Sequence, residues 1–506
     1  MEPDRHAHRQ KLKQLWGDSL RAGRNALGWE QAALLLVLCL GGGWAMTASM
    51  RDGLLRVMPD DAFYYLQIAW HWAAGQPSSF DGVNVTTGYH PLWQWLLIPL
   101  AWMTGERALL ARLAALLGLA FMLGSAAWLS MRLRHERRAA AWFPALWVMI
   151  TLVPAWIYGM EMPLTVLLFT ALWLAQPASF LCPRRNLWIG LLCALLMLAR
   201  LDTFAWTGMI NAAALGRAFK RRRTLPFLAL MLPQAIGVGG YLLSNALISG
   251  HALPIHALLK LSRYEAFSFS IPFCWLYALA LLSIPFSLWG AWCASGARLL
   301  AAGNLFYLAL LLSRGGEETW DWYFVLPVWS LAWLVPAWLA SQQGRLSKQA
   351  RSLLLALMLV GAALGSVIDL ARRPNPFAPV YDQARALAPM PANSVVLASS
   401  DCGALAYFSR QRVLNLDGLT AGGGFLEAIR EDTFARWLQA QGLNGYIDIA
   451  QPPLREHAVL HTWPGLQGVG RAARVTLSPW QPLGERWHLM RVDKIDPFSL
   501  PPGGSE

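Results

Sequence analysis

The sequence predicts an all-α membrane domain that crosses the lipid bilayer about eleven times, followed by a small C-terminal α/β domain outside the membrane. Three observations lead to this prediction. Hydrophobic residues make up 56% of the chain and charged residues only 14%, so most of the surface is expected to face lipid. Long apolar segments recur between residues 31 and 370. Residues 371–506 have the composition of a soluble domain instead.

A membrane-crossing helix needs about 20 mostly apolar residues, because the hydrocarbon layer is about 30 Å thick. Residues 1–30 are polar and basic, and the apolar run after them is too long for a cleavable signal peptide. They are therefore predicted to form a cytoplasmic tail, with a transmembrane domain over 31–370. The predicted crossing helices are 31–50, 107–131, 139–159, 162–177, 187–200, 203–219, 225–248, 272–294, 297–313, 321–340 and 351–370.

The apolar segment 91–104, at the end of the predicted first outer loop 51–106, decides the topology. If it does not cross, the N-terminus and the basic loops all lie on the cytoplasmic side, as the positive-inside rule requires. Charge therefore favours an interfacial or re-entrant helix, with a crossing helix as the alternative. The basic loops concerned are 132–138, 184–185, 220–223 and 345–351.

The formal charge of +13 does not indicate a nucleic-acid partner, because the basic residues are confined to these short loops. In this topology the carboxylates of the membrane domain fall mostly at the outer ends of helices. The C-terminal domain is predicted to contain strands at 395–399, 412–416 and 445–450 and helical stretches at 380–388 and 425–441.

The first outer loop contains two adjacent carboxylates, Asp60 and Asp61, directly after the first membrane helix. Adjacent acids repel each other, so a site that keeps both usually uses them on a proton or a cation. The ordinary explanation of such a pair is an N-cap that also interacts with the helix dipole.

The stretch 58-MPDDAFYYLQIAWHWAAGQPSSFDGVNVTTGYHPLWQW-95 resembles the first extracytoplasmic loop of the GT-C superfamily of membrane glycosyltransferases, whose bacterial members show a pattern like DDAFYYLxIAxNxAxGxGxSFDGxxxTNGYHPLW. The segments 158–168, 198–203, 250–260 and 401–420 are similar to further motifs of the same superfamily, in the expected order. Met162 departs from the pattern at a position that is usually small or polar. The matching residues of the first loop are Asp60, Asp61, Phe63, Tyr64, Tyr65, Ile68, Ala69, Ala73, Gly75, Phe80, Asp81, Gly82, Thr86, Gly88, Tyr89, His90, Pro91, Leu92 and Trp93.

The resemblance implies an inverting transfer of a sugar from a polyprenyl-phosphate donor to a hydroxyl group of a glycan, lipid or protein. The reaction would take place at the outer face of a bacterial cytoplasmic (inner) membrane, with the C-terminal domain in the periplasm. Asp60 would be the general base, with Asp61 as the second choice. Glu161 and His90 would orient the acceptor. A divalent ion, Mg²⁺ or Mn²⁺, would be held by Asp60, Asp61 and Glu161, if the enzyme uses one.

The resemblance further implies that Lys260, with Arg263 behind it, binds the donor phosphate. Asp60, Glu161 and Lys260 are then expected to line one cavity. Simpler explanations compete at each position. Lys260 and Arg263 are typical of interfacial cations that reach toward the headgroups. His90 stands before Pro91 and fits a packing role.

Two other functions remain alternatives from the sequence. An O-antigen-type polymerase or ligase also has about a dozen helices, but its large outer loop comes later in the chain. A lipid-linked-glycan transporter would show broken helices at matching positions of two halves, and no such symmetry is visible.

Arg200 and Asp202 are close enough in sequence to pair with each other.

The topology is testable with reporter fusions. A fusion in the 220–223 loop is expected to be cytoplasmic, and a fusion after residue 371 periplasmic, because the basic loops should stay inside. An active cytoplasmic reporter after residue 371 would overturn this topology.

Overall fold

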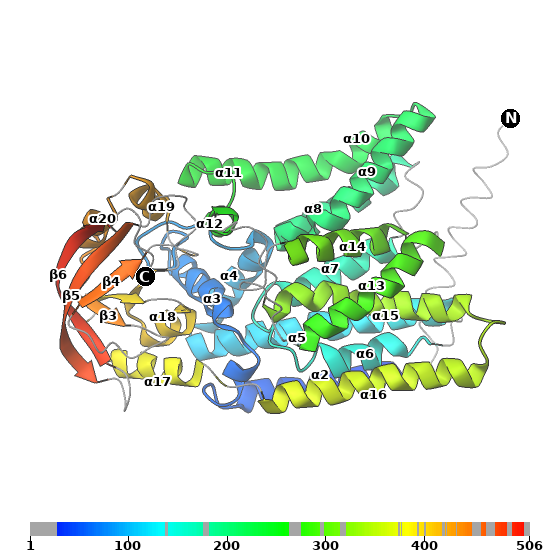
Figure 1. Ribbon diagram of the computed structural model, residues 1–506, viewed down its shortest axis with the longest axis horizontal. Coiled ribbons are helices and arrows are strands. Elements are labelled where there is room, and N and C mark those ends of the chain that lie inside the picture. Colours follow the sequence, from blue (N-terminus) through cyan, green and yellow to red (C-terminus); the bar gives the residue numbers. More distant parts are fainter. Residues whose placement is uncertain are drawn as a thin grey trace.

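In the computed structural model the chain forms a long helical bundle with a β-sheet domain at one end (Figure 1). The multi-span membrane fold with a C-terminal mixed sheet, predicted from the sequence, is confirmed. The structure describes residues 28–136, 140–175, 182–262, 275–293, 298–313, 320–372, 375, 377–391, 394–398, 401–416, 420, 422–431, 433–447, 457–461, 471–482 and 488–499.

The main helices of the bundle run between the end that carries the sheet, called here the sheet end, and the opposite end (Figure 1). Those helices are α2 (Trp29–Thr47), α5 (Arg107–His135), α6 (Phe143–Thr151), α7 (Met162–Leu174), α8 (Pro183–Ala199), α9 (Phe204–Arg221), α10 (Leu225–Gln234), α11 (Gly240–Ser249), α13 (Trp275–Cys293), α14 (Arg298–Ser313), α15 (Val325–Ser341) and α16 (Lys348–Arg372). Shorter elements are η1 (Leu54–Arg56), α3 (Asp60–Ala73), α4 (Pro91–Thr104), η2 (Leu201–Thr203), η3 (Ala235–Gly239), α12 (Ile255–Ser262) and η5 (Asp321–Phe324).

Six of the described helical stretches are long and apolar enough to cross a membrane. Others of the predicted eleven are shorter than expected. The predicted crossing 139–159 forms only the nine-residue α6, which ends at Thr151 because Pro154 and Gly159 interrupt the helix that would follow. Helices α7 and α14 are apolar but shorter. The six stretches are Trp29–Thr47, Arg107–His135, Leu225–Ser249, Trp275–Cys293, Asp321–Ser341 and the stretch that contains α16.

The segment 91–104 forms α4, which stays near the sheet end. At its C-terminal end Trp102 donates to the carbonyl of Ala73, the last residue of α3, at 2.9 Å. Arg107, at the start of the next helix, donates to the carbonyl of Tyr407 in the C-terminal domain. Both neighbours of α4 in the chain thus lie at the sheet end, as expected of a helix that does not cross.

The turns α9–α10 and α15–α16 both lie at the opposite end of the bundle (Figure 1). They contain the basic segments 220–223 and 345–351, so these two loops share one side of the membrane domain, as predicted.

The sheet has six strands in the order β2-β1-β3-β6-β5-β4. β1 pairs in parallel with β2 and β3, and the other neighbours are antiparallel. The predicted strands correspond to the three parallel ones, while β4, β5 and β6 were not predicted. The elements are α17 (Phe377–Leu387), β1 (Val395–Ala398), α18 (Gly403–Ser409), β2 (Arg412–Asn415), α19 (Gly423–Arg430), α20 (Phe434–Ala440), β3 (Gly445–Ile447), β4 (His457–His461), β5 (Arg471–Pro482) and β6 (His488–Ser499).

Helices α3 and α18 join the two parts of the molecule. The ring of Phe63 packs against the rings of Tyr407 and Phe408 at centroid distances of 5.6 and 5.2 Å. Gly403 begins α18, and a Cβ atom at this position would lie 2.9 Å from Oδ2 of Asp60 and still closer to its backbone oxygen. The close approach of the two helices therefore requires glycine.

Replacing Gly403 by Ala is expected to lower the stability of this junction by about 1–3 kcal/mol, the usual cost of overpacking. Thermal unfolding and limited proteolysis of the detergent-solubilised protein would measure it. Gly424→Ala is the matched control, because a Cβ there meets only Nε1 of Trp437 at an ordinary 3.6 Å. Equal stability of the two variants would contradict the tight docking.

Candidate functional site

Helix α3 has two polar faces that point to different parts of the molecule. Asp60 and Tyr64, one turn apart, face α18. The amide N–H groups of Gly403 and Ala404 donate to the two carboxylate oxygens of Asp60, at 2.6 and 2.8 Å. The hydroxyl of Tyr64 accepts the N–H of Cys402 at 3.1 Å. Asp60 is therefore the N-terminal cap of a helix that lies 343 residues further along the chain.

Asp60 is nearly inaccessible, at 2% exposure. Burial and the nearby Asp401 carboxylate raise the pKa of Asp60 well above its ordinary value, while the two amide hydrogen bonds act in the other direction. The structure gives this carboxylate a docking role, and the geometry does not favour it as the base.

A second contact ties the same loop to the sheet domain. Asp81 accepts the N–H of Val83 and the N–H of Asn84, which shapes the turn after α3. Its other oxygen accepts from Nη2 of Arg412 on β2 at 3.0 Å. Helix α3 and the loop that follows it are thus each held by the C-terminal domain.

The opposite face of α3 points into the bundle. Tyr65 is one turn after Asp61, so the two side chains lie on the same face. The hydroxyl of Tyr65 donates to Oε2 of Glu161, the residue before α7, at 2.9 Å. Asp61 is half-buried in the first turn of α3.

Glu161 is fully buried, and its charge is balanced by Arg200 at the end of α8. Nη1 of Arg200 donates to Oε1 of Glu161 at 2.6 Å. Nε of the same guanidinium lies 2.9 Å from each carboxylate oxygen of Asp202. The hydroxyl of Tyr307 donates to Asp202 at 3.2 Å, and the ring of Tyr323 lies 4.7 Å from the guanidinium carbon.

The carboxylates of Asp202 and Glu161 lie within hydrogen-bond distance of the Arg200 guanidinium and balance its buried charge. The guanidinium therefore stays charged. The predicted pairing of Arg200 with Asp202 is confirmed, and the structure adds Glu161 as a second partner.

His90 lies beside this ion-pair cluster. Its Nε2 is 3.9 Å from Oε1 of Glu161. Its ring meets the ring of His256, on α12, edge to face at a centroid distance of 5.2 Å. Lys260 follows His256 by four residues in the backbone of α12, and its side chain lies outside the described part of the structure. The predicted phosphate ligand Arg263 lies outside the described residues.

The structure therefore brings His90, Glu161 and His256 of α12 together, whereas Asp60 contacts α18. Asp61 shares the face of α3 that carries Tyr65. Two of the three carboxylates suggested as metal ligands already have protein partners for both oxygens. Both oxygens of Asp60 accept backbone amides, and both oxygens of Glu161 accept side-chain donors. Among the described residues no group of three or more His, Cys, Asp and Glu side chains is arranged to hold a metal ion.

No protein-family model and no curated protein matches the chain. Its structure, however, matches that of ArnT from Cupriavidus metallidurans bound to undecaprenyl phosphate, with a TM-score of 0.56 and 14% sequence identity. The match covers 91% of this chain and 98% of ArnT. The apo form of the same ArnT matches with a TM-score of 0.53, over 91% of this chain and 96% of that one.

The chain has the ArnT fold. The arrangement expected from the sequence, many membrane helices followed by a C-terminal mixed domain, is thereby confirmed at the level of the fold. At 14% identity, the ArnT fold explains the arrangement of the helices and of the C-terminal domain, while the roles of individual side chains rest on the contacts described above.

Within this ArnT fold, sequence reasoning missed the contributions of three residues. Tyr65 was a matching motif residue without an assigned role. His256 lies inside the motif 250–260, two residues after Pro254, and only its contact with His90 indicates its place. Arg200 is 39 residues from Glu161, and no local spacing predicts their contact.

Replacing Arg200 by Met is expected to lower stability by about 3–5 kcal/mol, because Glu161 and Asp202 would remain buried without their cation. Thermal unfolding in detergent would measure the loss. Arg132→Met is the control, because Arg132 pairs with Glu136 near the surface and such a pair contributes about 0–1 kcal/mol. A similar, small loss in both variants would show that the buried cluster is not essential to the fold.

Proposed function

We propose that this chain is an inverting glycosyltransferase that moves a sugar from a polyprenyl-phosphate donor to a hydroxyl acceptor. The observation that carries the proposal is the contact of Glu161 with His90 and with Tyr65 of α3, the helix that also carries Asp61, in a chain with the ArnT fold. The ArnT of that comparison binds undecaprenyl phosphate, which is the lipid part of such a donor. The acceptor would be a glycan, lipid or protein of the cell envelope.

Asp61 is the base in this proposal. A hydroxyl group that attacks an anomeric carbon must lose its proton to a group within hydrogen-bond reach. Asp60 has both oxygens occupied and is almost fully buried. Asp61 is more exposed, and it lies on the same face of α3 as Tyr65, whose hydroxyl donates to Glu161. We therefore assign the role of general base to Asp61 rather than to Asp60.

Glu161 acts in this proposal by position rather than by proton transfer. Arg200 and Tyr65 fix its two oxygens, so its carboxylate cannot turn toward a substrate without breaking a buried ion pair. It lies 3.9 Å from Nε2 of His90 and therefore favours an imidazole orientation with a proton on that atom. His90, held in this orientation, is the group that contacts the acceptor or the donor in this proposal.

The leaving group is a lipid phosphate, which needs a cation to stabilise its developing charge. Helix α12 supplies the candidate, because Lys260 is one turn from His256 and His256 contacts His90. No step of this proposal is routed through a metal ion. In the described part of the chain no observation favours the polymerase, ligase or transporter alternatives over the transferase.

Asp61→Asn is expected to lower transfer by roughly 10²–10⁴-fold, the usual effect of losing a general base, with donor binding retained. Turnover on a panel of purified polyprenyl-phosphate sugars, measured together with binding of the lipid donor, would show this. Lys260→Ala is expected to weaken donor binding instead.

Asp60→Asn is the matched control. The amide keeps an oxygen that accepts one backbone N–H, so stability is expected to fall while turnover of the folded fraction falls much less than in Asp61→Asn. If Asp61→Asn transfers sugar at the normal rate and Asp60→Asn does not, the base is Asp60 and the assignment made here is wrong.

A further inference from the structure

The peptide group between Tyr89 and His90 is hydrogen-bonded on both of its sides. Its N–H, which belongs to His90, donates to the hydroxyl of Tyr65. That hydroxyl in turn donates to Oε2 of Glu161. The peptide oxygen, which belongs to Tyr89, accepts from the hydroxyl of Tyr241 on α11 at 3.3 Å. Because a peptide group is planar and stiff, this one unit links α11 to the site that contains Glu161.

The hydroxyl of Tyr241 is held in place by its own surroundings. Tyr241 is buried, and its ring belongs to a small apolar cluster with Leu198 of α8 and Val238 of η3. Its hydroxyl also hydrogen-bonds the side chain of Asn245, one turn further along α11. Nδ2 of Asn245 donates to the carbonyl of Ala252, in the segment that leads to α12. The proton of Tyr241 is therefore directed at the peptide group by contacts on two sides.

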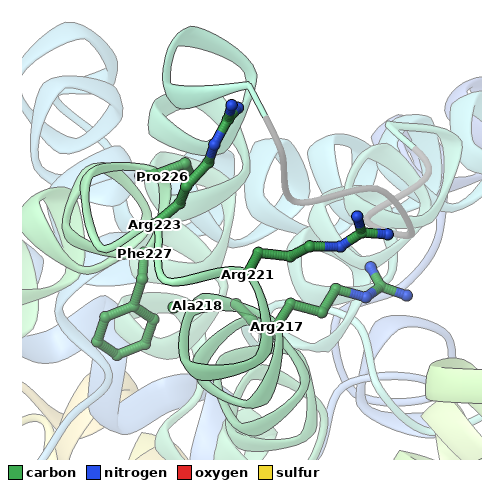
Figure 2. Close-up of a pocket in the computed structure, with 7 residues that line it drawn as sticks. Arg217, Ala218, Arg221, Arg223, Pro226 and Phe227 are labelled. Atoms are coloured by element: carbon green, nitrogen blue, oxygen red, sulfur yellow. The ribbon is translucent and has the colours of Figure 1, made fainter.

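Helix α10, which precedes α11 in the same apolar stretch, is fixed by tight packing. A Cβ atom at Gly190 of α8 would lie only 2.1 Å from the carbonyl oxygen of Leu230, so the two helices touch at the backbone. At the start of α10, Pro226 and Phe227 line one pocket with Ala218 of α9 (Figure 2). The position of α10 therefore does not depend on the first outer loop.

Helix α11 has much less support of this kind. It is separated from α10 by the π-helical turn η3 and runs from there toward the sheet end (Figure 1). Its only buried side chains are those of Tyr241 and Asn245, while Leu243 and Leu247 are exposed by 61% and 79%. The hydrogen bond from Tyr241 to the peptide oxygen is thus a main attachment of α11 to the first outer loop.

From these contacts we propose that Tyr241 is a positioning residue for His90. The inference rests on the function proposed above, in which His90 contacts the acceptor or the donor. Tyr241 fixes the peptide group that enters His90, the residue that precedes α4. The imidazole is thereby kept 3.9 Å from Oε1 of Glu161. Such alignment matters because a displacement of about 1 Å can slow a reaction by up to roughly 10²-fold.

The test compares Tyr241→Phe with the unchanged full chain in detergent. Phenylalanine keeps the packed ring and removes only the hydroxyl. The reaction of His90 with diethyl pyrocarbonate, followed by peptide mass spectrometry, reports how firmly its imidazole is held. Losing one hydrogen bond changes an equilibrium by roughly three- to tenfold, so His90 is expected to react faster by about that factor. Turnover on the polyprenyl-phosphate sugars is expected to fall by a similar factor.

Tyr407→Phe is the matched control. It removes the hydroxyl of another buried tyrosine that donates to a backbone carbonyl, that of Arg107. The reaction of His90 should keep its normal rate in this variant. Equal acceleration in both variants would indicate general loosening of the protein and would rule out a specific role for Tyr241.

A double variant tests whether Tyr241 acts through His90. Adding Tyr241→Phe to His90→Asn should slow transfer no further than His90→Asn alone, whereas two independent effects would multiply. An unchanged His90 reaction rate in Tyr241→Phe, or a full additional loss in the double variant, would refute the inference. If even the unchanged chain uses none of the donors, the proposed function fails, and the reaction of His90 still decides the role of Tyr241.

Discussion

The arrangement of the site depends on one buried ion, the guanidinium group of Arg200. It holds Glu161, which precedes α7, and Asp202, which follows α8, in the same cluster. Through the hydroxyl groups of Tyr65 and Tyr307 it also reaches α3 and α14. A charge without partners is too costly to bury, so the ends of these four helices must meet in one geometry for the protein to fold. The position of helix α3 is fixed by the same cluster, because Tyr65 of α3 donates to Glu161.

The sequence predicted the elements of the site better than their contacts. The long first-loop motif identified α3 and both of its acids, and the apolar pattern identified most of the membrane helices. Arg200 and Asp202 are near neighbours in the chain, so their pairing was predictable. The contact of Arg200 with Glu161 depends on how α7 and α8 pack, and the local spacing of residues carries no information about that.

The two adjacent acids show why the surroundings of individual side chains could not be predicted from the sequence. Asp60 and Asp61 have the same chemistry and nearly the same position in the chain. Their surroundings differ because consecutive residues of a helix point about 100° apart, and because α18 docks on only one of the two faces. Only the folded C-terminal domain, whose last three strands were themselves not predicted, separates a docking residue from a candidate base.

The amide groups that satisfy Asp60 are those of Gly403 and Ala404, close to the end of the chain. The first loop emerges early in synthesis, when these partners do not yet exist. Until they are made and have folded onto α3, Asp60 has only water as its partner and α3 lacks half of its support. The helix that carries the proposed base is thus docked by amide groups that lie 343 residues later in the chain than the carboxylate that accepts them, so its final position is reached only after the C-terminal domain has begun to fold.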